Sequence, residues 1–185
     1  MTSPEIGDEF LKRNALIIFL ISLLIYPLFS VNAQQRKGAS GLPLPRFVSL
    51  KSNPVNLRKG PGRQYPKAWV FKRAGLPVEI YEEYGHWRRI RDSEGASGWI
   101  LKTLLSGRRT ALVLPWNKAT AGNRTYADLL SAARVRASPV AKLEAGSLVS
   151  LRSCDGRWCL VTVSRFKGYL QQKQLWGVYQ DERVE

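Results

Sequence analysis

Two cysteines and one histidine are the side chains of this sequence with the most versatile chemistry. Cys154 and Cys159 stand in the stretch CDGRWC, and His86 stands in YGHW, at the tip of an expected hairpin far from both cysteines. A cysteine nucleophile needs a base held beside its thiolate, and no histidine follows residue 86. One histidine and two cysteines also do not match the four ligands of a typical zinc site. We therefore expect no catalytic residue, no metal site and no cofactor.

The spacing of the cysteines bears on their pairing. Cys-x4-Cys differs from the Cys-x-x-Cys of thioredoxin-like redox sites, and two nearby cysteines in an exported chain are typical of a disulfide. A two-residue turn at Asp155-Gly156 would make Cys154 and Cys159 diagonal neighbours about 7–8 Å apart, beyond the reach of a disulfide. The bond therefore predicts a four-residue loop, 155–158, with the two cysteines as direct cross-strand partners.

Carboxylates and glycines supply two further chemical hypotheses. Glu79, Glu82 and Glu83 lie on one expected strand, with neighbours on opposite faces, and we interpret them as a solvated strand face. The basic, glycine-rich stretch 59–65, KGPGRQY, lacks the Lys-Ser or Lys-Thr of a P-loop, and no helical pattern follows it. We expect a loop after a strand and not a phosphate site.

The amino-terminal segment predicts export. Lys12 and Arg13 precede an apolar run of about 15 residues, shorter than the roughly 20 of a membrane span, and Val31-Asn32-Ala33 has the small residues of a cleavage site. We interpret residues 1–33 as a secretory signal peptide cleaved after Ala33, and 34–46 as a linker. The alternative is an uncleaved inner-membrane anchor, favoured by the acidic residues near the start.

The chain is strongly basic, with 29 Lys and Arg against 14 Asp and Glu. Removal of residues 1–33 leaves 27 basic and 11 acidic residues, a net charge of +16. Such a charge favours polyanionic surroundings: nucleic acid, anionic lipid or an acidic wall polymer. Because exported chains rarely meet nucleic acid, we expect a periplasmic protein of the cell envelope, with nucleic acid an unlikely partner.

The second half of the chain repeats the first. The matches at a constant separation of 71 residues are Gly75/Gly146, Val78/Val149, Ile80/Leu151, Gly85/Gly156, Trp87/Trp158 and Ile90/Val161. Gly98-Trp99-Ile100 recurs as Gly168-Tyr169-Leu170 at 70, and Leu57, Arg58 and Pro61 recur as Val135, Arg136 and Pro139 at 78. Alternating stretches such as LPVEIYE and SLVSLRS predict short strands. We infer a duplicated all-β unit, with one or two helical turns expected over 125–133.

The order VNLRKGPG, then GLPVEIYEEYGHWRRIR, then GWILKTLL resembles the bacterial SH3 (SH3b) domain family. The resemblance implies two tandem small SH3-like β-barrels after the signal peptide: domain 1 over 47–114, a linker over 115–130, a degenerate domain 2 over 131–179 and a tail over 180–185. It implies peptidoglycan or envelope protein segments as ligands, and no catalysis. The alternatives are an accessory activator of a wall hydrolase and a basic nucleic-acid-binding protein.

One asymmetry between the copies predicts a ligand site in the first. The separation falls from 78 residues at Pro61/Pro139 to 70 at Val70/Val140, which indicates that the second copy lacks eight residues of the loop that holds Tyr65. A loop absent from one copy is a candidate working surface in the other. The predicted aromatic, basic shelf consists of Arg58, Arg63, Tyr65, Tyr84 and Trp87. Aromatic faces stack on sugars or prolines, and arginines bind carboxylates; we interpret Trp99 as barrel packing and GLPLP as a weak candidate for an internal ligand.

Overall fold

The computed structural model describes residues 36–114 and 126–185. The predicted signal peptide 1–33, its cleavage site after Ala33, and residues 115–125 of the predicted linker lie outside the described residues. Within the described ranges the secondary structure is almost entirely β, and no helix there is long and apolar enough to cross a membrane. The predicted all-β fold with two tandem SH3-like units is confirmed.

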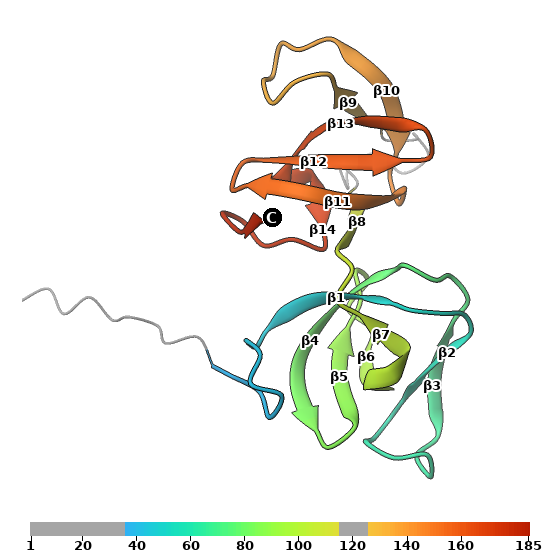
Figure 1. Ribbon diagram of the computed structural model, residues 1–185. Helices are drawn as coiled ribbons and strands as arrows, with labels where there is room; N and C mark the ends of the chain where they lie inside the picture. The colour runs from blue at the N-terminus through green and yellow to red at the C-terminus, as the bar shows by residue number, and fades with distance from the viewer. Residues whose placement is uncertain (1–35, 115–125) are drawn as a thin grey trace, which may run out of the picture. The chain divides into compact units, whose positions relative to one another are not determined.

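The first repeat is a curled seven-stranded antiparallel sheet (Figure 1). Its elements are β1 (Arg46–Leu50), β2 (Val55–Arg58), β3 (Lys67–Phe71), β4 (Pro77–Tyr84), β5 (Trp87–Arg91), β6 (Ser97–Leu101), the 3-10 turn η1 (Lys102–Leu104) and β7 (Leu105–Ser106). The strand order is β3-β2-β6-β5-β4-β1-β7. Apolar side chains that alternate along the strands, such as Val78, Ile80 and Ile90, fill the interior.

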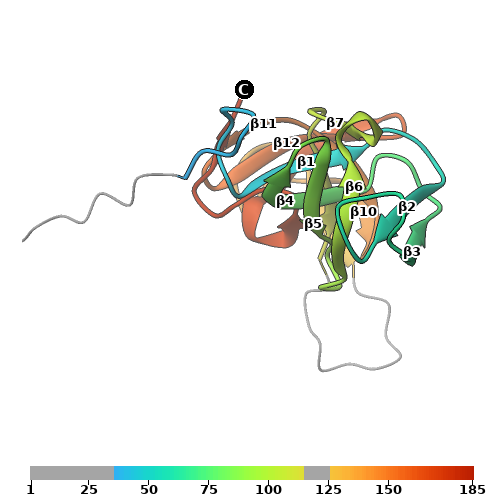
Figure 2. The same cartoon turned by 90° about the horizontal axis from the view of Figure 1, so that it is seen from below.

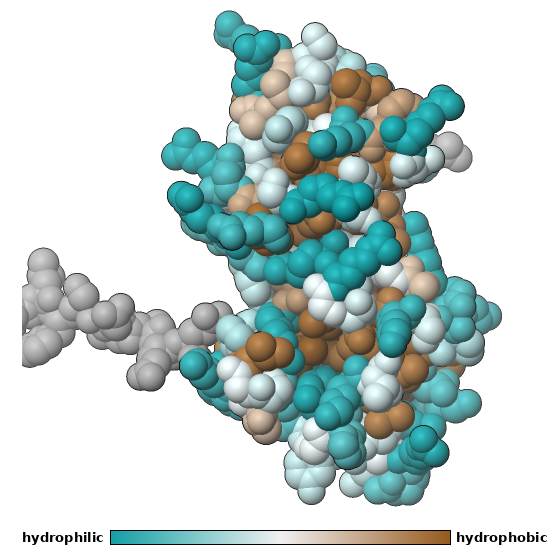
Figure 3. Space-filling model, in the orientation of Figure 1, coloured by the Kyte–Doolittle hydropathy of each residue, from teal (hydrophilic) through white to brown (hydrophobic). Residues whose placement is uncertain are grey.

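The second repeat has the same topology. Its elements are β8 (Thr110–Val113), β9 (Tyr126–Leu130), β10 (Pro139–Glu144), β11 (Leu148–Asp155), β12 (Trp158–Val163), β13 (Phe166–Gln171), η2 (Gln172–Gln174), β14 (Leu175–Trp176) and β15 (Arg183–Val184). The order β10-β9-β13-β12-β11-β8-β14 equals that of the first sheet with every number raised by seven, and β15 is added against β11. The two repeats are therefore copies of one fold. On the face shown in Figure 3, apolar residues lie between a majority of hydrophilic ones over both repeats.

The boundary between the repeats differs from the predicted one. Thr110–Val113, placed by sequence in domain 1, forms β8, which pairs with β11 and β14 of the second sheet. Ala111 and Val113 are fully buried there, so this strand is the counterpart of β1. The expected helical turns over 125–133 are also wrong. Residues 126–130 form β9, because alternate residues Ala127 and Leu129 are buried and the strand pairs with both β10 and β13.

The segment 36–45, predicted as part of a linker, is a short arm packed on the first barrel. Lys37 and Pro43 form a β-bridge, and the Gly38 N–H donates to the Leu42 carbonyl at 2.8 Å. Leu44 joins the hydrophobic core of the first sheet. The GLPLP stretch therefore helps to close the barrel, because it carries a core leucine.

The register of the repeats differs from the predicted one at β2 and β9. The pair Val55↔Phe71 recurs as Ala127↔Leu143, a separation of 72 residues and not 78. The counterpart of Leu57 is accordingly Leu129, which is fully buried, whereas Val135 is 73 % exposed. The sequence match at 78 was wrong because it followed an Arg and a Pro and ignored burial.

The loop after the first strand of each hairpin is present in both copies. The Lys59 N–H donates to the Pro66 carbonyl at 3.1 Å, and the Ser131 N–H donates to the Ser138 carbonyl at 2.9 Å. The two loops, 59–66 and 131–138, therefore have the same length and the same closing hydrogen bond. The predicted deletion is wrong, and Ala137 stands in the second loop where Tyr65 stands in the first.

Side chains also join the two repeats, whose described residues belong to one compact unit. The ring of Phe47 packs edge-on against Trp176, with centroids 5.2 Å apart, and lies 4.7 Å from the ring of Tyr179. The Tyr179 hydroxyl donates to Glu79 Oε1 at 2.7 Å. Burial, and next the hydrogen bond to Glu79, raise the pKa of Tyr179, so its phenol remains a donor.

Two equivalent glycines allow close strand crossings, which gives a first testable prediction. A Cβ on Gly98 would lie 2.7 Å from the Arg58 carbonyl oxygen, and one on Gly168 would lie 2.6 Å from that of Leu130. Each backbone blocks the added methyl, so we expect alanine at either position to lower the free energy of unfolding by about 1–3 kcal/mol in denaturant titration. Gly107→Ala is the control, because a Cβ there meets nothing within 4 Å. Equal midpoints for all three variants would contradict this account.

Candidate functional site

A groove opens on the first barrel between the β2–β3 hairpin, the start of β5 and η1. We call it the first groove; it measures about 310 Å³ and is lined by Asn56, Arg58, Arg63, Trp87, Leu101 and Leu104. The β2–β3 hairpin stands at the edge of its sheet in both ribbon views (Figures 1 and 2). The groove therefore combines two cations, one aromatic ring and two aliphatic side chains.

Arg58 shapes this groove from below the loop. Its Nη1 donates to the carbonyl of Arg63 at 2.9 Å and to that of Tyr65 at 2.7 Å. A single guanidinium thus holds both ends of the turn that carries Arg63. Arg63 itself is exposed, which leaves it as the more available cation for a ligand.

Trp87 and Tyr84 lie side by side across the β4–β5 hairpin. They are direct cross-strand partners, Tyr84 is 65 % exposed, and Trp87 is half-buried. The His86 carbonyl accepts the Lys102 N–H at 2.9 Å, which ties the hairpin to η1. Trp87 is thereby held on the groove wall, with Tyr84 at its rim.

The predicted residues are brought together only in part. Arg58, Arg63 and Trp87 line the first groove, and Tyr84 borders it. Tyr65 is 41 % exposed but does not line it, because its ring covers Gly60, where a Cβ would lie 2.4 Å from a ring atom. The sequence reasoning missed Asn56, Leu101 and Leu104, although the Gly-Trp-Ile-Leu stretch and the turn after it were the available signal.

The second barrel has an equivalent groove with different chemistry. We call it the second groove; its lining is Val135, Gly156, Arg157, Trp158, Gln171, Gln172, Lys173, Gln180 and Asp181. Trp158 corresponds to Trp87, since the pair Trp87↔Leu101 recurs as Trp158↔Gln171. Val135 stands in place of Arg63. The second groove thus keeps the aromatic ring and loses one arginine and the aliphatic residues.

Two of the three glutamates on β4 are buried, which corrects the expectation of a solvated strand face. The side chains of Glu79 and Glu83 are 1 % exposed, and only Glu82 is on the surface, where it pairs with Arg89 at 3.1 Å. Glu79 accepts hydrogen bonds from Arg91 and Tyr179. The strand face is covered by neighbouring elements that the local alternation does not reveal.

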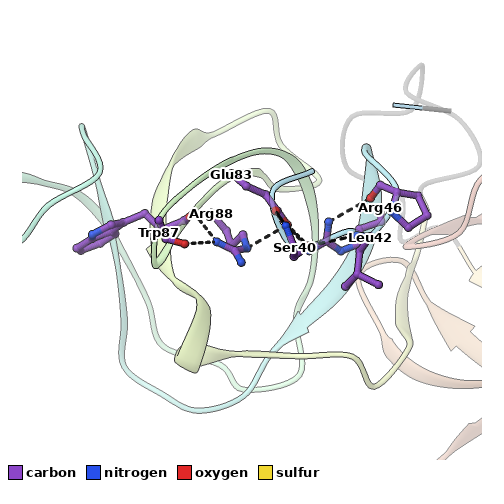
Figure 4. Close-up of polar contacts among 8 residues, drawn as sticks. Ser40, Leu42, Arg46, Glu83, Trp87 and Arg88 are labelled. Atoms are coloured by element: carbon purple, nitrogen blue, oxygen red, sulfur yellow. Dashed lines mark hydrogen bonds and ion pairs between the residues drawn. The ribbon is translucent and has the colours of Figure 1, made fainter. Parts of the chain in front are cut away.

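Glu83 is the centre of a polar cluster that also contains Ser40, Arg46 and Arg88, the Glu83 cluster (Figure 4). Glu83 Oε1 lies 2.7 Å from Arg46 Nη2 and 3.2 Å from Arg88 Nε, and its Oε2 accepts the Ser40 N–H at 2.7 Å. Burial opposes the charged form of Glu83, but the hydrogen bonds from Arg46 and Ser40 outweigh it and lower its pKa. Arg88 also donates to the Gly85 and Trp87 carbonyls, so the cluster supports the hairpin of the first groove, while the Trp87 ring points away from it (Figure 4).

The predicted disulfide is confirmed. Cys154 and Cys159 are bonded, are direct partners in the β11–β12 ladder, and flank a four-residue loop as expected. Asp155 Oδ1 accepts the N–H groups of Arg157 and Trp158 at 2.8 and 2.7 Å, which closes that loop, and these bonds lower the pKa of Asp155.

Two small barrels, each with a groove between a long loop, a hairpin and a 3-10 turn, define a class of binding modules. A family model described as the bacterial SH3 domain matches residues 51–107 and 124–177, and the chain belongs to this family. The family and the Cys154–Cys159 disulfide point to an exported or cell-envelope protein.

Two solved structures are among those similar to this chain. They are NlpC1 and NlpC2 from Trichomonas vaginalis, at 17 % and 16 % identity and a TM-score of 0.31 each. The matches cover 75 % and 71 % of this chain and 48 % of each of those chains, so this chain spans about half of their length. No curated protein sequence matches the chain.

Proposed function

We propose that this chain is an exported, non-catalytic binding protein that engages peptidoglycan or an envelope protein segment through the first groove. The observation that carries the proposal is the composition of that groove: Trp87 and two leucines supply apolar contact beside Arg63. An aromatic ring next to an arginine suits ligands that combine an apolar or sugar face with a carboxylate. Peptides of the cell wall and segments of envelope proteins both offer this combination.

The first barrel is the recognition module in this proposal, and the second barrel supports it. The second groove has Val135 and Gln171 in place of Arg63 and Leu101, and residues Gln180 and Asp181 of the chain itself form one of its walls. The disulfide and the ring contacts of Phe47 with Trp176 and Tyr179 give the second barrel a structural role. Periplasmic localisation after removal of residues 1–33 completes the proposal, with anchoring by the uncleaved segment as its alternative.

Pull-down of the purified protein on isolated sacculi tests the peptidoglycan branch. We expect Trp87→Ala to reduce the bound fraction by about tenfold, because truncating a central aromatic residue removes one of the main contacts of a groove. Trp158→Ala is the matched control, since it removes the equivalent ring from the second groove and is expected to leave binding unchanged. Retention equal to that of the unaltered chain in the Trp87 variant would place any binding elsewhere.

Zymography with the same purified chain tests the non-catalytic assignment. No clearing of a peptidoglycan gel is expected from the chain alone. Clearing by the chain would refute the proposal, and clearing that needs an added wall hydrolase would identify an activator.

A further inference from the structure

The second barrel binds a segment of its own chain beside its groove. The side chain of Gln172, only 1 % exposed, donates from Nε2 to the carbonyls of Tyr179 and Glu182, the latter at 3.0 Å. A Cβ on Gly156 would lie 3.4 Å from the Asp181 carbonyl oxygen, so this segment also touches the hairpin. We call Tyr179–Val184 the tail segment.

Further contacts fix the conformation of the tail segment. Val184 is the ladder partner of Cys154 on β11. Arg109 holds the Glu182 carboxylate with two hydrogen bonds, at 2.7 and 3.1 Å, and the other side of that carboxylate accepts the Tyr179 N–H at 2.8 Å. The molecule thus contains an example of how a short, acidic piece of chain is seated at this end of the barrel.

The same seat is open on the first barrel. Lys102 begins η1 as Gln172 begins η2, and Lys102 is exposed where Gln172 is buried. A Cβ on Gly85 meets nothing within 4 Å, in contrast to Gly156. Among the described residues, the arm 36–45 contributes none to the lining of the first groove. A segment from another molecule therefore has access to this surface.

The side chains around the open seat differ from their counterparts in a consistent direction. Lys102 replaces Gln172, and Arg63 replaces Val135, which adds two positive charges. Leu101 replaces Gln171, which adds apolar surface beside Trp87. The surface complementary to this seat is acidic and carries an apolar side chain.

We infer that the first groove and the adjoining seat bind an extended, acidic protein segment, placed as the tail segment is placed on the second barrel. Lys102 donates to its backbone carbonyls or carboxylates, Arg63 binds a carboxylate, and an apolar side chain enters between Trp87 and Leu101. The inference rests on the proposed function and narrows its ligand from envelope polymers or proteins to a protein segment. Attraction between these cations and an acidic segment weakens with added salt.

Fluorescence anisotropy with a labelled peptide tests the inference. The probe is GVYQDERVE, the sequence of residues 177–185, and the comparison peptide carries Asn and Gln in place of its Asp and Glu residues. We expect saturable binding of the acidic probe to the purified protein, at least tenfold weaker binding of the neutral peptide, and a further decrease with salt. Lys102→Glu is expected to weaken binding of the probe at least tenfold.

Two controls assign the binding to the first barrel. Lys72→Glu makes the same charge change at an exposed position outside the groove and is expected to leave the dissociation constant unchanged. Gln172→Ala acts on the seat of the second barrel, and loss of binding with this variant but not with Lys102→Glu would overturn the inference.

The failure of this inference is distinguishable from that of the proposed function. No binding of the probe at millimolar concentration, or equal binding of the neutral peptide, overturns the inference. If sacculi are still retained through Trp87 in that case, the proposed function stands with peptidoglycan as the ligand. Loss of both activities refutes both.

Discussion

Replacing Glu83 with alanine is expected to lower the free energy of unfolding by about 3–5 kcal/mol. The side chain of Glu83 is 1 % exposed, and those of its partners Arg46 and Arg88 are 17 % and 9 % exposed. The substitution leaves two largely buried guanidinium groups without a counter-charge and removes the acceptor for Ser40. Because Arg88 also holds the Gly85 and Trp87 carbonyls, we expect weaker ligand binding at the first groove as well.

Glu82→Ala is the matched control for this prediction. Glu82 is the neighbour of Glu83 on β4 and pairs with Arg89 at 3.1 Å, but both side chains are at least 40 % exposed. Surface pairs of this kind contribute about 0–1 kcal/mol, so the denaturant midpoint is expected to change little. If the two variants were equally destabilised, burial of the Glu83 cluster would not be the reason.

The stability conferred by Glu83 is expected to depend on pH in a definite direction. The pKa of Glu83 in the folded protein lies below its usual value of 4.5, so the folded state binds fewer protons than the unfolded state near that pH. The contribution is therefore complete above pH 4.5 and is lost as the pH falls through the lower, folded value. Urea titrations of the unaltered protein and of Glu83→Ala should converge as the pH is lowered over that range. A difference that stays constant down to pH 2 would show that the charge of Glu83 is not involved.

The sequence was most informative where a local signal coincides with a turn or a crossing. Gly98 and Gly168 are needed because the opposite backbone leaves no room for a Cβ, and this need recurs at a fixed spacing. The alternating residues of β4 and β11 were equally readable. These signals sufficed for the duplicated barrel and for the pairing of Cys154 with Cys159.

The sequence was less informative where an element is defined by a distant partner. Nothing in TALV of β8 shows which sheet it joins, because that depends on its pairing with β11 and β14. Glu83 lies on an alternating strand whose outer half looks solvated until Ser40 and Arg46 cover it. The same limit applied to the groove, in which Arg58 and Trp87 were recognised but the wall from η1 was not.

The two repeats solve one structural problem in two ways. Glu83 and Arg88 are direct partners in the β4–β5 ladder, and Cys154 and Cys159 are direct partners at the equivalent place in the β11–β12 ladder, 71 residues later. An ion pair thus stands in the first barrel where a covalent bond stands in the second. In both, a terminal segment covers the pair: the arm with Ser40 in the first, and β15 with Val184 in the second.

Removing the disulfide is therefore the counterpart of removing Glu83. The double substitution Cys154→Ala and Cys159→Ala is expected to lower the free energy of unfolding by about 2–4 kcal/mol, since the bond restricts the unfolded chain and both residues lie in the core. Val184 pairs with Cys154, so β15 should also loosen. Hydrogen exchange is expected to be faster at Val184 and unchanged at strands of the first barrel.

Reduction of the unaltered protein separates the bond from the side-chain change. Under a strong thiol reductant the bond is cleaved while both sulfur atoms stay in the core, so the loss of stability should be a little smaller than in the double variant. The double variant itself should not respond to reductant. A reduced protein with an unchanged midpoint would mean that the packing around Cys154 and Cys159, with no help from the covalent link, is enough to hold the hairpin that the first barrel holds with Glu83 and Arg88.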